Sequence, residues 1–254
     1  MIKLENISKS FEGSFRPIIN NVSLELQKGE FCIIIGSNGS GKSTFLRLIA
    51  GEHKVDEGSI FVQGTDVTRK NRNDYITSVV QDVNKGTIPE MTLLENMVLS
   101  YKGDKISGLS FYKNFRSNIL HEIQKLGIGL EAYLDTKLMH LSGGQRQIIA
   151  TVMAIISEPK ILLLDEHTSA LDPKIQRILM NYTISTIKEN NITSFMVTHR
   201  LDDAIKYGDR LVMIHNGEIV FDIKGDKKSS ITIDELLSLF HKYENLSLIG
   251  GKDE

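Results

Sequence analysis

The residues best suited to chemistry form a glycine-rich run between an apolar segment and a helical one. Residues 36–43 read GSNGSGKS and fit the pattern G-x-x-x-x-G-K-[ST]. Glycines at these positions let backbone N–H groups point at phosphate oxygens, and the following helix N-terminus adds a favourable dipole. The predicted ATP and Mg²⁺ contacts come from Gly36, Ser37, Asn38, Gly39, Ser40, Gly41, Lys42, Ser43 and Thr44, with Lys42 reaching the β- and γ-phosphates and Ser43 the metal. A glycine-rich turn with a chance lysine is the alternative, which the flanking strand and helix disfavour.

A second candidate is the apolar run 161–164, which ends in two carboxylates, Asp165 and Glu166. A strand that ends this way places Asp165 at the carboxyl edge of a sheet, where ligands bind in this architecture. Asp165 can hold Mg²⁺ through its water shell, and Glu166 can orient and deprotonate the attacking water. By itself the pair could be a solvated turn. The phosphate-binding pattern in the same chain favours the catalytic interpretation.

The third candidate is the sequence LSGGQ at 141–145. Ser142 can cap the helix that follows, which is a purely structural explanation. Ser-Gly-Gly at a helix N-terminus is also a second anion-binding surface. We therefore expect the same segment, with the residues Ser142, Gly143, Gly144 and Gln145, to grip a phosphate as well.

With these three motifs in this order, the sequence resembles the ATP-binding-cassette (ABC) ATPases over nearly its whole length, and LSGGQ is that family's signature. The resemblance implies an α/β fold: a P-loop core with a mostly parallel sheet, an N-terminal antiparallel β-subdomain and an inserted α-helical subdomain. It also implies a head-to-tail dimer. In that dimer the signature of one copy closes over the γ-phosphate that the P-loop of the other copy holds.

The resemblance assigns roles to four further positions. Phe11 corresponds to the aromatic residue that stacks on adenine, although a core phenylalanine would have the same spacing. Gln81 corresponds to the glutamine that senses Mg²⁺ and the attacking water. His199 corresponds to the switch histidine at the γ-phosphate, although a lone histidine is usually structural or solvated. Residues 169–172, SALD, correspond to the loop that crosses the dimer interface.

Two positions depart from the commonest family pattern. His167 stands where most members have proline, and Arg200 where a small or acidic polar residue is usual. Neither change removes a catalytic group, so we expect activity to survive. The strings DEHTSALDP, KYGDRL and ITIDELLSLFHK resemble bacterial importer ATPases that work with a separate permease and a lipoprotein binding protein. Several of those are assigned to uptake of tryptophan or related amino acids.

The elements that must position these residues follow from apolar periodicity. Short apolar runs alternate with longer helical patterns, as in an α/β domain. We predict strands at 2–7, 22–26, 31–35, 59–62, 76–80, 161–165, 193–198, 210–215 and 218–221, and helices at 42–50, 93–100, 117–126, 144–156, 173–188 and 232–243. One domain, 1–254, is expected, with about 1–90 and 141–254 as the core and β-subdomain and about 91–140 as the inserted helical subdomain.

The composition narrows the class of protein. The chain has 254 residues, a formal net charge of -2 and a single cysteine, Cys32, which we expect in the core. This charge gives no global attraction to nucleic acid, and no nucleic-acid partner is expected. The N-terminal residues lack the apolar region of a signal peptide, and no apolar run is long enough for a membrane span. We expect a cytoplasmic protein that is peripheral on the inner face of the cell membrane.

Three classes of function stay open at this point. The favoured one is the motor of an importer, in which ATP-driven dimer closure changes the conformation of a permease supplied by an extracytoplasmic binding protein. The second is an exporter motor, since the cassette looks much the same in both directions. The third is a soluble ABC ATPase acting on ribosomes or DNA, which the single cassette and the absence of heptads or a cysteine cluster in the sequence disfavour.

Overall fold

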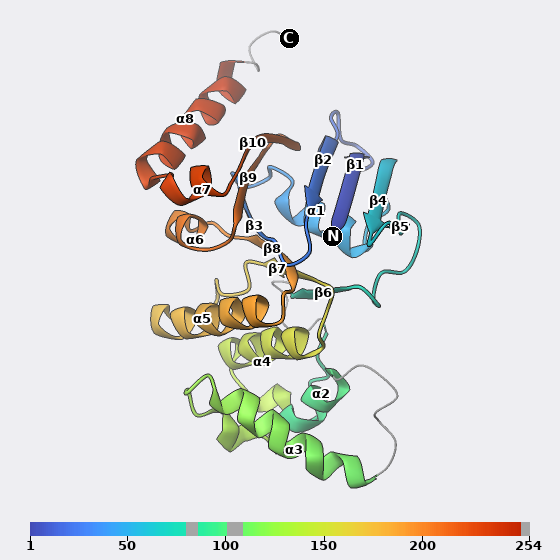
Figure 1. The fold of residues 1–254 in the computed structure, drawn as a ribbon, viewed down its shortest axis with the longest axis vertical. Coiled ribbons are helices and arrows are strands. Elements are labelled where there is room, and N and C mark those ends of the chain that lie inside the picture. The colour runs from blue at the N-terminus through green and yellow to red at the C-terminus, as the bar shows by residue number, and fades with distance from the viewer. Residues whose placement is uncertain (80–85, 101–108, 250–254) are drawn as a thin grey trace. The chain divides into compact units, whose positions relative to one another are not determined.

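The computed structural model describes residues 1–79, 86–100 and 109–249, and the side chains of these residues except 109–114 and 244–249 (Figure 1). The chain divides into two compact units. The first comprises Met1–Asp74 and Thr193–Glu254, and the second comprises Tyr75–Ile192. The predicted insertion at about 91–140 lies within the second unit and stays a prediction as a subdomain of its own.

The first unit contains an antiparallel sheet with the strand order β2-β1-β4-β5. Its strands are β1 (Ile2–Lys9), β2 (Ile19–Leu26), β4 (Glu57–Val62) and β5 (Thr65–Asp66). Alternate residues of β1, among them Ile2 and Leu4, are buried, as the period of a half-buried strand requires. The antiparallel region predicted near the N-terminus is therefore confirmed, with strands a few residues longer than expected.

A second set of strands in this unit has the order β10-β9-β3-β8. Here β3 (Phe31–Ile35) runs parallel to both β8 (Thr193–Val197) and β9 (Arg210–His215), and β10 (Glu218–Lys224) returns antiparallel to β9. Every residue of β3 and β8 is buried, as expected of strands covered on both faces. Cys32 lies in this core, where burial raises the pKa of its thiol. The predicted core role of Cys32 is confirmed.

Four helices belong to the described part of the first unit: α1 (Lys42–Ala50), α6 (Leu201–Lys206), α7 (Asp226–Ser230) and α8 (Ile233–Ile249). The bounds of α1 are those predicted. Helices α6 and α7 were not predicted, because five or six residues are too few to show a helical period. Helix α8 begins one residue later than predicted and continues six residues further.

The second unit pairs β6 (Ile76–Val79) in parallel with β7 (Ile161–Asp165). Its helices are α2 (Leu93–Ser100), α3 (Leu109–Gln124), α4 (Gly143–Ile156) and α5 (Pro173–Glu189), with short 3₁₀ turns at Leu130–Tyr133 and Leu138–His140. Helix α3 begins eight residues before the predicted start. The polar, glycine-containing segment 101–110 was predicted to separate the two helices, so its last two residues, Leu109 and Ser110, lie in the helix instead. Ser110 and Asn114 are weak helix formers, so this stretch gives a weak helical signal. No helix in the described ranges combines the length and apolar character of a membrane span.

Arg72 is a buried cation in the first unit that ties α1 to the β-region. Its side chain is 2% exposed. Its Nη1 donates to the carbonyl oxygens of Leu48 and Ile49 in the last turn of α1, the latter at 2.9 Å. Its Nε donates to Val67 O at 2.8 Å and Nη2 to Thr68 O at 2.7 Å. The guanidinium thus gives the Ile49 carbonyl in the last turn of the helix a partner, and it adds a second donor to the Leu48 carbonyl, which also accepts from Gly51 N.

We expect Arg72→Met to lower the free energy of unfolding by about 3 kcal/mol, because it removes four hydrogen bonds, and of the four carbonyl groups only those of Leu48 and Val67 keep a backbone donor. Urea unfolding followed by circular dichroism measures the change. Arg69→Met is the matched control, since Arg69 is exposed and its loss should change stability by less than about 0.5 kcal/mol. Equal stability of the two variants would contradict this capping role.

Candidate functional site

The loop at residues 36–41 follows β3 directly and has a backbone that only glycine permits at two points. Gly36 has φ 151°, and a Cβ atom there would collide with the carbonyl oxygen of Ile214. Gly41 has φ 105°, and a Cβ atom would lie 2.6 Å from Ile18 O. The first and last glycines of the predicted phosphate loop are therefore required by the chain's own packing.

The polar groups of this loop are arranged for an anion. Lys42 is buried, and its Nζ donates to the carbonyl oxygens of Gly36 at 2.9 Å and Ser37 at 2.8 Å. The hydroxyl of Ser40 is buried without a hydrogen-bond partner in the described ranges. A buried hydroxyl in this position is costly unless a ligand completes it. The glycine-rich loop, the ammonium group of Lys42 and the unpaired hydroxyl group of Ser40 together fit a phosphate group.

The remaining predicted contacts surround this cradle. Asn38 and Gly39 are exposed at the tip of the loop, and Gly39 has φ 78°. Ser43 and Thr44 lie in the first turn of α1 and are half-buried. The structure thus brings all nine predicted loop residues together at the N-terminus of one helix, where a dipole favours anions.

The turn between β9 and β10 supports the loop from outside, a contribution that sequence reasoning missed. Asn216 (φ 48°) and Gly217 (φ 79°) form the turn, and Gly217 N donates to Ser40 O at 3.0 Å. Gly217 O accepts from Asn20 N at 2.9 Å. The Asn-Gly pair predicted a hairpin, but nothing in the sequence indicated what the hairpin touches.

We expect Gly217→Ala to weaken ATP binding about tenfold, because a Cβ atom there would lie 2.5 Å from Ile18 O and would push the turn away from Ser40. Titration calorimetry with ATP measures the change. Gly64→Ala is a close control: Gly64 also has φ 79°, but its Cβ atom would meet nothing within 4 Å. If Gly64→Ala weakens ATP binding as much as Gly217→Ala does, backbone strain alone explains the loss of affinity. The contact between Gly217 and Ser40 would then not be needed.

His199 also belongs to the first unit and lies two residues beyond β8. Val197 of β8 pairs with Ile34 of β3, so the carboxyl ends of both strands reach the same edge. His199 is exposed there. The phosphate loop follows β3 at the same edge, and the switch role of His199 stays a prediction.

Arg200, the second departure from the family pattern, is the N-cap residue of α6. Its backbone N donates to Thr198 Oγ1 at 3.1 Å, and its Nε pairs with Asp203 Oδ2 at 3.2 Å. Burial raises the pKa of Asp203. The contacts of Arg200 with Thr198 and Asp203 therefore link the residue before His199 to the first turn of α6.

Phe11 is 39% exposed, so it is not the core phenylalanine that its spacing also allowed. Its ring is nearly perpendicular to that of His53, with centroids 5.2 Å apart, and Lys9 Nζ lies 5.4 Å from the Phe11 centroid. An exposed aromatic face with a neighbouring cation is compatible with stacking on a base. The adenine-stacking role stays a prediction.

Asp165 and Glu166 belong to the second unit, at the end of the fully buried strand β7. Asp165 is 9% exposed. Glu166 has φ 50°, a left-handed conformation that costs free energy in a non-glycine residue and is frequent at functional sites. His167 is buried, and burial lowers its pKa to about 4, so it is neutral near pH 7. Its Nε2 has no hydrogen-bond partner in the described ranges.

The predicted signature forms the start of α4, with Ser142 as its N-cap. Gln145 N donates to Ser142 Oγ at 3.2 Å, and Ser142 N donates to Gln145 Oε1 at 2.9 Å. This capping box confirms the structural role of Ser142. A Cβ atom at Gly143 would meet nothing within 4 Å, whereas one at Gly144 would lie 3.1 Å from Leu171 Cδ2.

The loop 169–172 ends at Asp172, which caps α5 by accepting from the backbone N of Lys174 and Ile175.

Gln81, a predicted contact of metal and water, lies outside the described residues. Within those residues no three His, Cys, Asp or Glu side chains gather to hold a metal by themselves.

The profile of the ABC transporter family matches residues 19–169, more than half of the chain. The Tyrosine transport ATP-binding protein of Clostridioides difficile is 41% identical over 247 residues, which cover 94% of this chain and 98% of that protein. The Spermidine/putrescine import ATP-binding protein PotA of Haemophilus influenzae is 35% identical, over 87% of this chain and 57% of that protein. The dimeric post-hydrolysis cassette MJ0796 bound to ADP and Pi has a TM-score of 0.76 at 31% identity, covering 88% of this chain and 98% of its own.

Proposed function

Because this chain belongs to the ABC transporter family and is an ATP-hydrolysing subunit of that family, we propose that it drives a bacterial importer of amino acids. The observation that carries the proposal is the 41% identity, over 94% of the chain, to a protein named for tyrosine transport. The second relative is named for spermidine/putrescine import, so transport is common to both names, import rests on the second and the amino-acid class rests on the first.

The proposed ATP site is composite. Lys42 and the N-terminus of α1 hold the β- and γ-phosphates from one copy, and Ser142–Gln145 of a second copy closes over the γ-phosphate. Gly143 supports this arrangement, because its glycine is not needed by the packing of its own chain. A close approach of an outside group to the backbone would explain it. The cassette MJ0796, which the fold resembles, is a dimer in its ADP- and Pi-bound structure.

Within that site each residue has one proposed role. Glu166 orients the attacking water and accepts its proton, and His199 contacts the γ-phosphate. Ser43, Asp165 and Gln81 hold Mg²⁺ directly or through water. The metal, when bound, neutralises charge on the phosphate oxygens. Phe11 stacks on adenine.

ATP binding favours the closed dimer, and phosphate release reopens it. For such a switch the nucleotide must favour closure by several kcal/mol, about 5 for a nearly complete shift. The proposed partners are a membrane permease, an extracytoplasmic binding protein that reaches the permease, and a second copy of this chain or a paralogue. The permease contacts the region of Gln81 and residues 82–91, and the chain lies at the inner face of the membrane.

Affinity purification of the tagged chain from detergent-solubilised membranes tests the function. Recovery of a permease together with an extracytoplasmic binding protein is the expected result. A permease without a binding protein would favour export instead. Recovery of ribosomes or DNA and no membrane protein would favour the soluble class. Uptake of labelled tyrosine by cells with and without the gene then tests the substrate class.

A further inference from the structure

A cavity with many positively charged residues lies in the first unit, and no residue of the phosphate loop lines it. It is formed by residues 50–54, where α1 ends, and residues 68–73, which follow β5. Its volume is about 420 Å³, which is in the range of small-molecule sites. We call it the basic cavity.

The lining of the basic cavity has an excess of positive charge. Of the described residues that line it, four are cationic and one is acidic: Lys54, Arg69, Lys70 and Arg72, with Glu52. With His53 neutral, this lining carries a formal charge of +3. Lys54, Arg69 and Lys70 are exposed, and the ion pairs of the described residues include none of the three. A concave surface with charge of one sign attracts ligands of the opposite sign.

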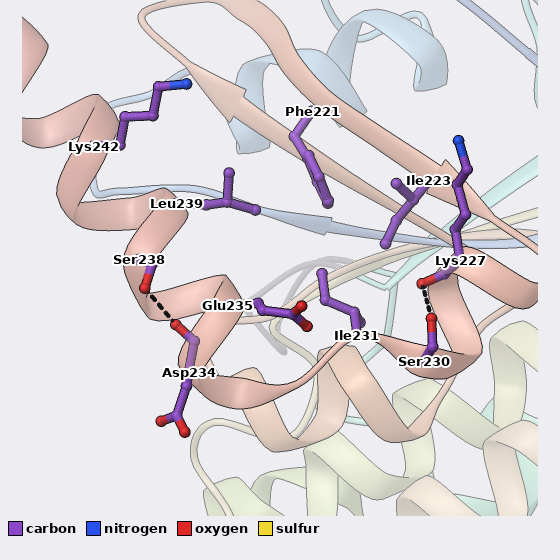
Figure 2. Close-up of a pocket in the computed structure, with 10 residues that line it drawn as sticks. All are labelled: Phe221, Ile223, Lys227, Ser230, Ile231, Asp234, Glu235, Ser238, Leu239 and Lys242. Atoms are coloured by element: carbon purple, nitrogen blue, oxygen red, sulfur yellow. Dashed lines mark hydrogen bonds between the residues drawn. The ribbon is translucent and has the colours of Figure 1, made fainter.

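The groove beside α8, between β10, α7 and α8, is a larger cavity of the same unit and differs in its lining. Its volume is about 630 Å³. Figure 2 shows Phe221, Ile223 and Leu239 along walls that are mainly apolar, with Lys227 and Lys242 at opposite ends of the groove. Charges so far apart cannot act on one small group. The clustered positive charge therefore distinguishes the basic cavity from this groove.

Arg72 contributes a buried cation to the basic cavity and has no carboxylate partner. Its four hydrogen bonds all go to backbone carbonyl oxygens, and no ion pair of the described residues includes it. Burial lowers the pKa of Arg72, and the charge of Asp66 raises it by less. A buried cation without a counterion is costly. An anion in the basic cavity would supply the missing negative charge.

The end of α1 beside the cavity would oppose an anion if its carbonyl groups were free, because the C-terminus of a helix carries a partial negative charge. These groups have donors instead. Leu48 O and Ile49 O accept from Arg72 Nη1, and Arg47 O accepts from the backbone N of the next two residues after Gly51, at 3.0 and 3.3 Å. The negative end of the helix is thus offset by the protein's own donors.

We propose that the basic cavity binds an oligophosphate anion, a ligand with two or more linked phosphate groups. Each phosphate group carries about 1.5 negative charges near pH 7, so two of them balance the charge of the lining. Lys54, Arg69 and Lys70 pair with the phosphate oxygens, and Arg72 adds its charge from inside the protein. The concave shape favours a small anion over a membrane surface. The site is separate from the phosphate loop, so the proposal does not depend on whether the chain hydrolyses ATP.

Inorganic pyrophosphate is the probe, used in calorimetric titrations of the full-length protein without divalent metal ions. Two equivalents should bind, one at the phosphate loop and one in the basic cavity. Lys42→Ala should keep the cavity equivalent. The double variant Arg69→Gln/Lys70→Gln should keep the loop equivalent and bind the cavity equivalent at least about tenfold more weakly, since it loses two charged hydrogen bonds. Loss of the loop equivalent alone would count against the phosphate loop and leave the cavity in place.

Two further variants separate a local site from a general effect of charge. The double variant Lys28→Gln/Lys224→Gln removes the same charge from exposed residues of the first unit outside the cavity, so both equivalents should bind as in the wild type. Glu52→Gln removes the acid of the lining and should strengthen binding of the cavity equivalent about twofold or more. Circular dichroism checks that all variants fold.

The source of the phosphate groups is tested in the Lys42→Ala variant with inorganic triphosphate and ATP. Equal affinities would show that the cavity binds the phosphate chain alone, and tighter binding of ATP would show a nucleotide site; both results support the proposal. It is overturned if Lys42→Ala binds no pyrophosphate, or if Lys28→Gln/Lys224→Gln loses as much affinity as Arg69→Gln/Lys70→Gln. Binding of anionic phospholipid vesicles through Arg69 and Lys70 without binding of pyrophosphate would also overturn it.

Discussion

Glu166→Gln is expected to lower the rate of ATP hydrolysis by a factor of about 10² to 10⁴ while ATP binding persists. The glutamine keeps the shape of the side chain but cannot accept the proton of the attacking water, and general bases contribute rate factors of this size. Phosphate release at saturating ATP and Mg²⁺ measures the rate. Because hydrolysis is what reopens the proposed dimer, size-exclusion chromatography with ATP should show this variant as a dimer.

Glu189→Gln is the matched control, because Glu189 is exposed at the end of α5. This variant should hydrolyse ATP at the wild-type rate. Turnover near the wild-type rate in Glu166→Gln would mean that another group is the base. A slow variant that remains monomeric with ATP would keep the base and remove the link between hydrolysis and dimer opening.

Lys42→Ala is expected to weaken ATP binding by a factor of about 10 to 100. Charge-assisted hydrogen bonds contribute about 1.5–3 kcal/mol each, and this variant removes the ammonium group that is proposed to hold the β- and γ-phosphates. Titration calorimetry gives the dissociation constant. Lys42→Met fills more of the volume of the buried side chain, so it separates lost charge from a collapsed loop.

The same titration of Lys28→Ala should give the wild-type affinity, because Lys28 is exposed before β3. Undiminished affinity in both Lys42 variants would rule out the proposed phosphate loop. Weak binding by Lys42→Ala with normal binding by Lys42→Met would instead assign the effect to the space that Lys42 fills between Gly36 and Ser37.

Prediction from the sequence succeeded best where a single period or motif was long enough to be unambiguous. The strand at 31–35 is a continuous apolar run and the strand at 161–165 is one up to Asp165, and both are buried along their whole length as predicted. Helix α1 begins at Lys42 as predicted, because three glycines cannot continue a strand and the apolar period starts after them. The short helices α6 and α7 were missed, because their folding depends on packing, with α7 against β10 and α6 against β3.

The sequence by itself determined the chemistry: a phosphate loop, a strand ending in Asp165 and Glu166, and a helix start at Ser142, each carried by adjacent residues. Only the tertiary structure decided which distant groups support them. Gly217 bonds to Ser40 and Arg72 closes the end of α1 because sheet and turn geometry bring together residues far apart in the chain. The groove beside α8 is likewise invisible in the sequence, because its charges and apolar walls come from three elements that meet only when β10 and the C-terminal helices fold together.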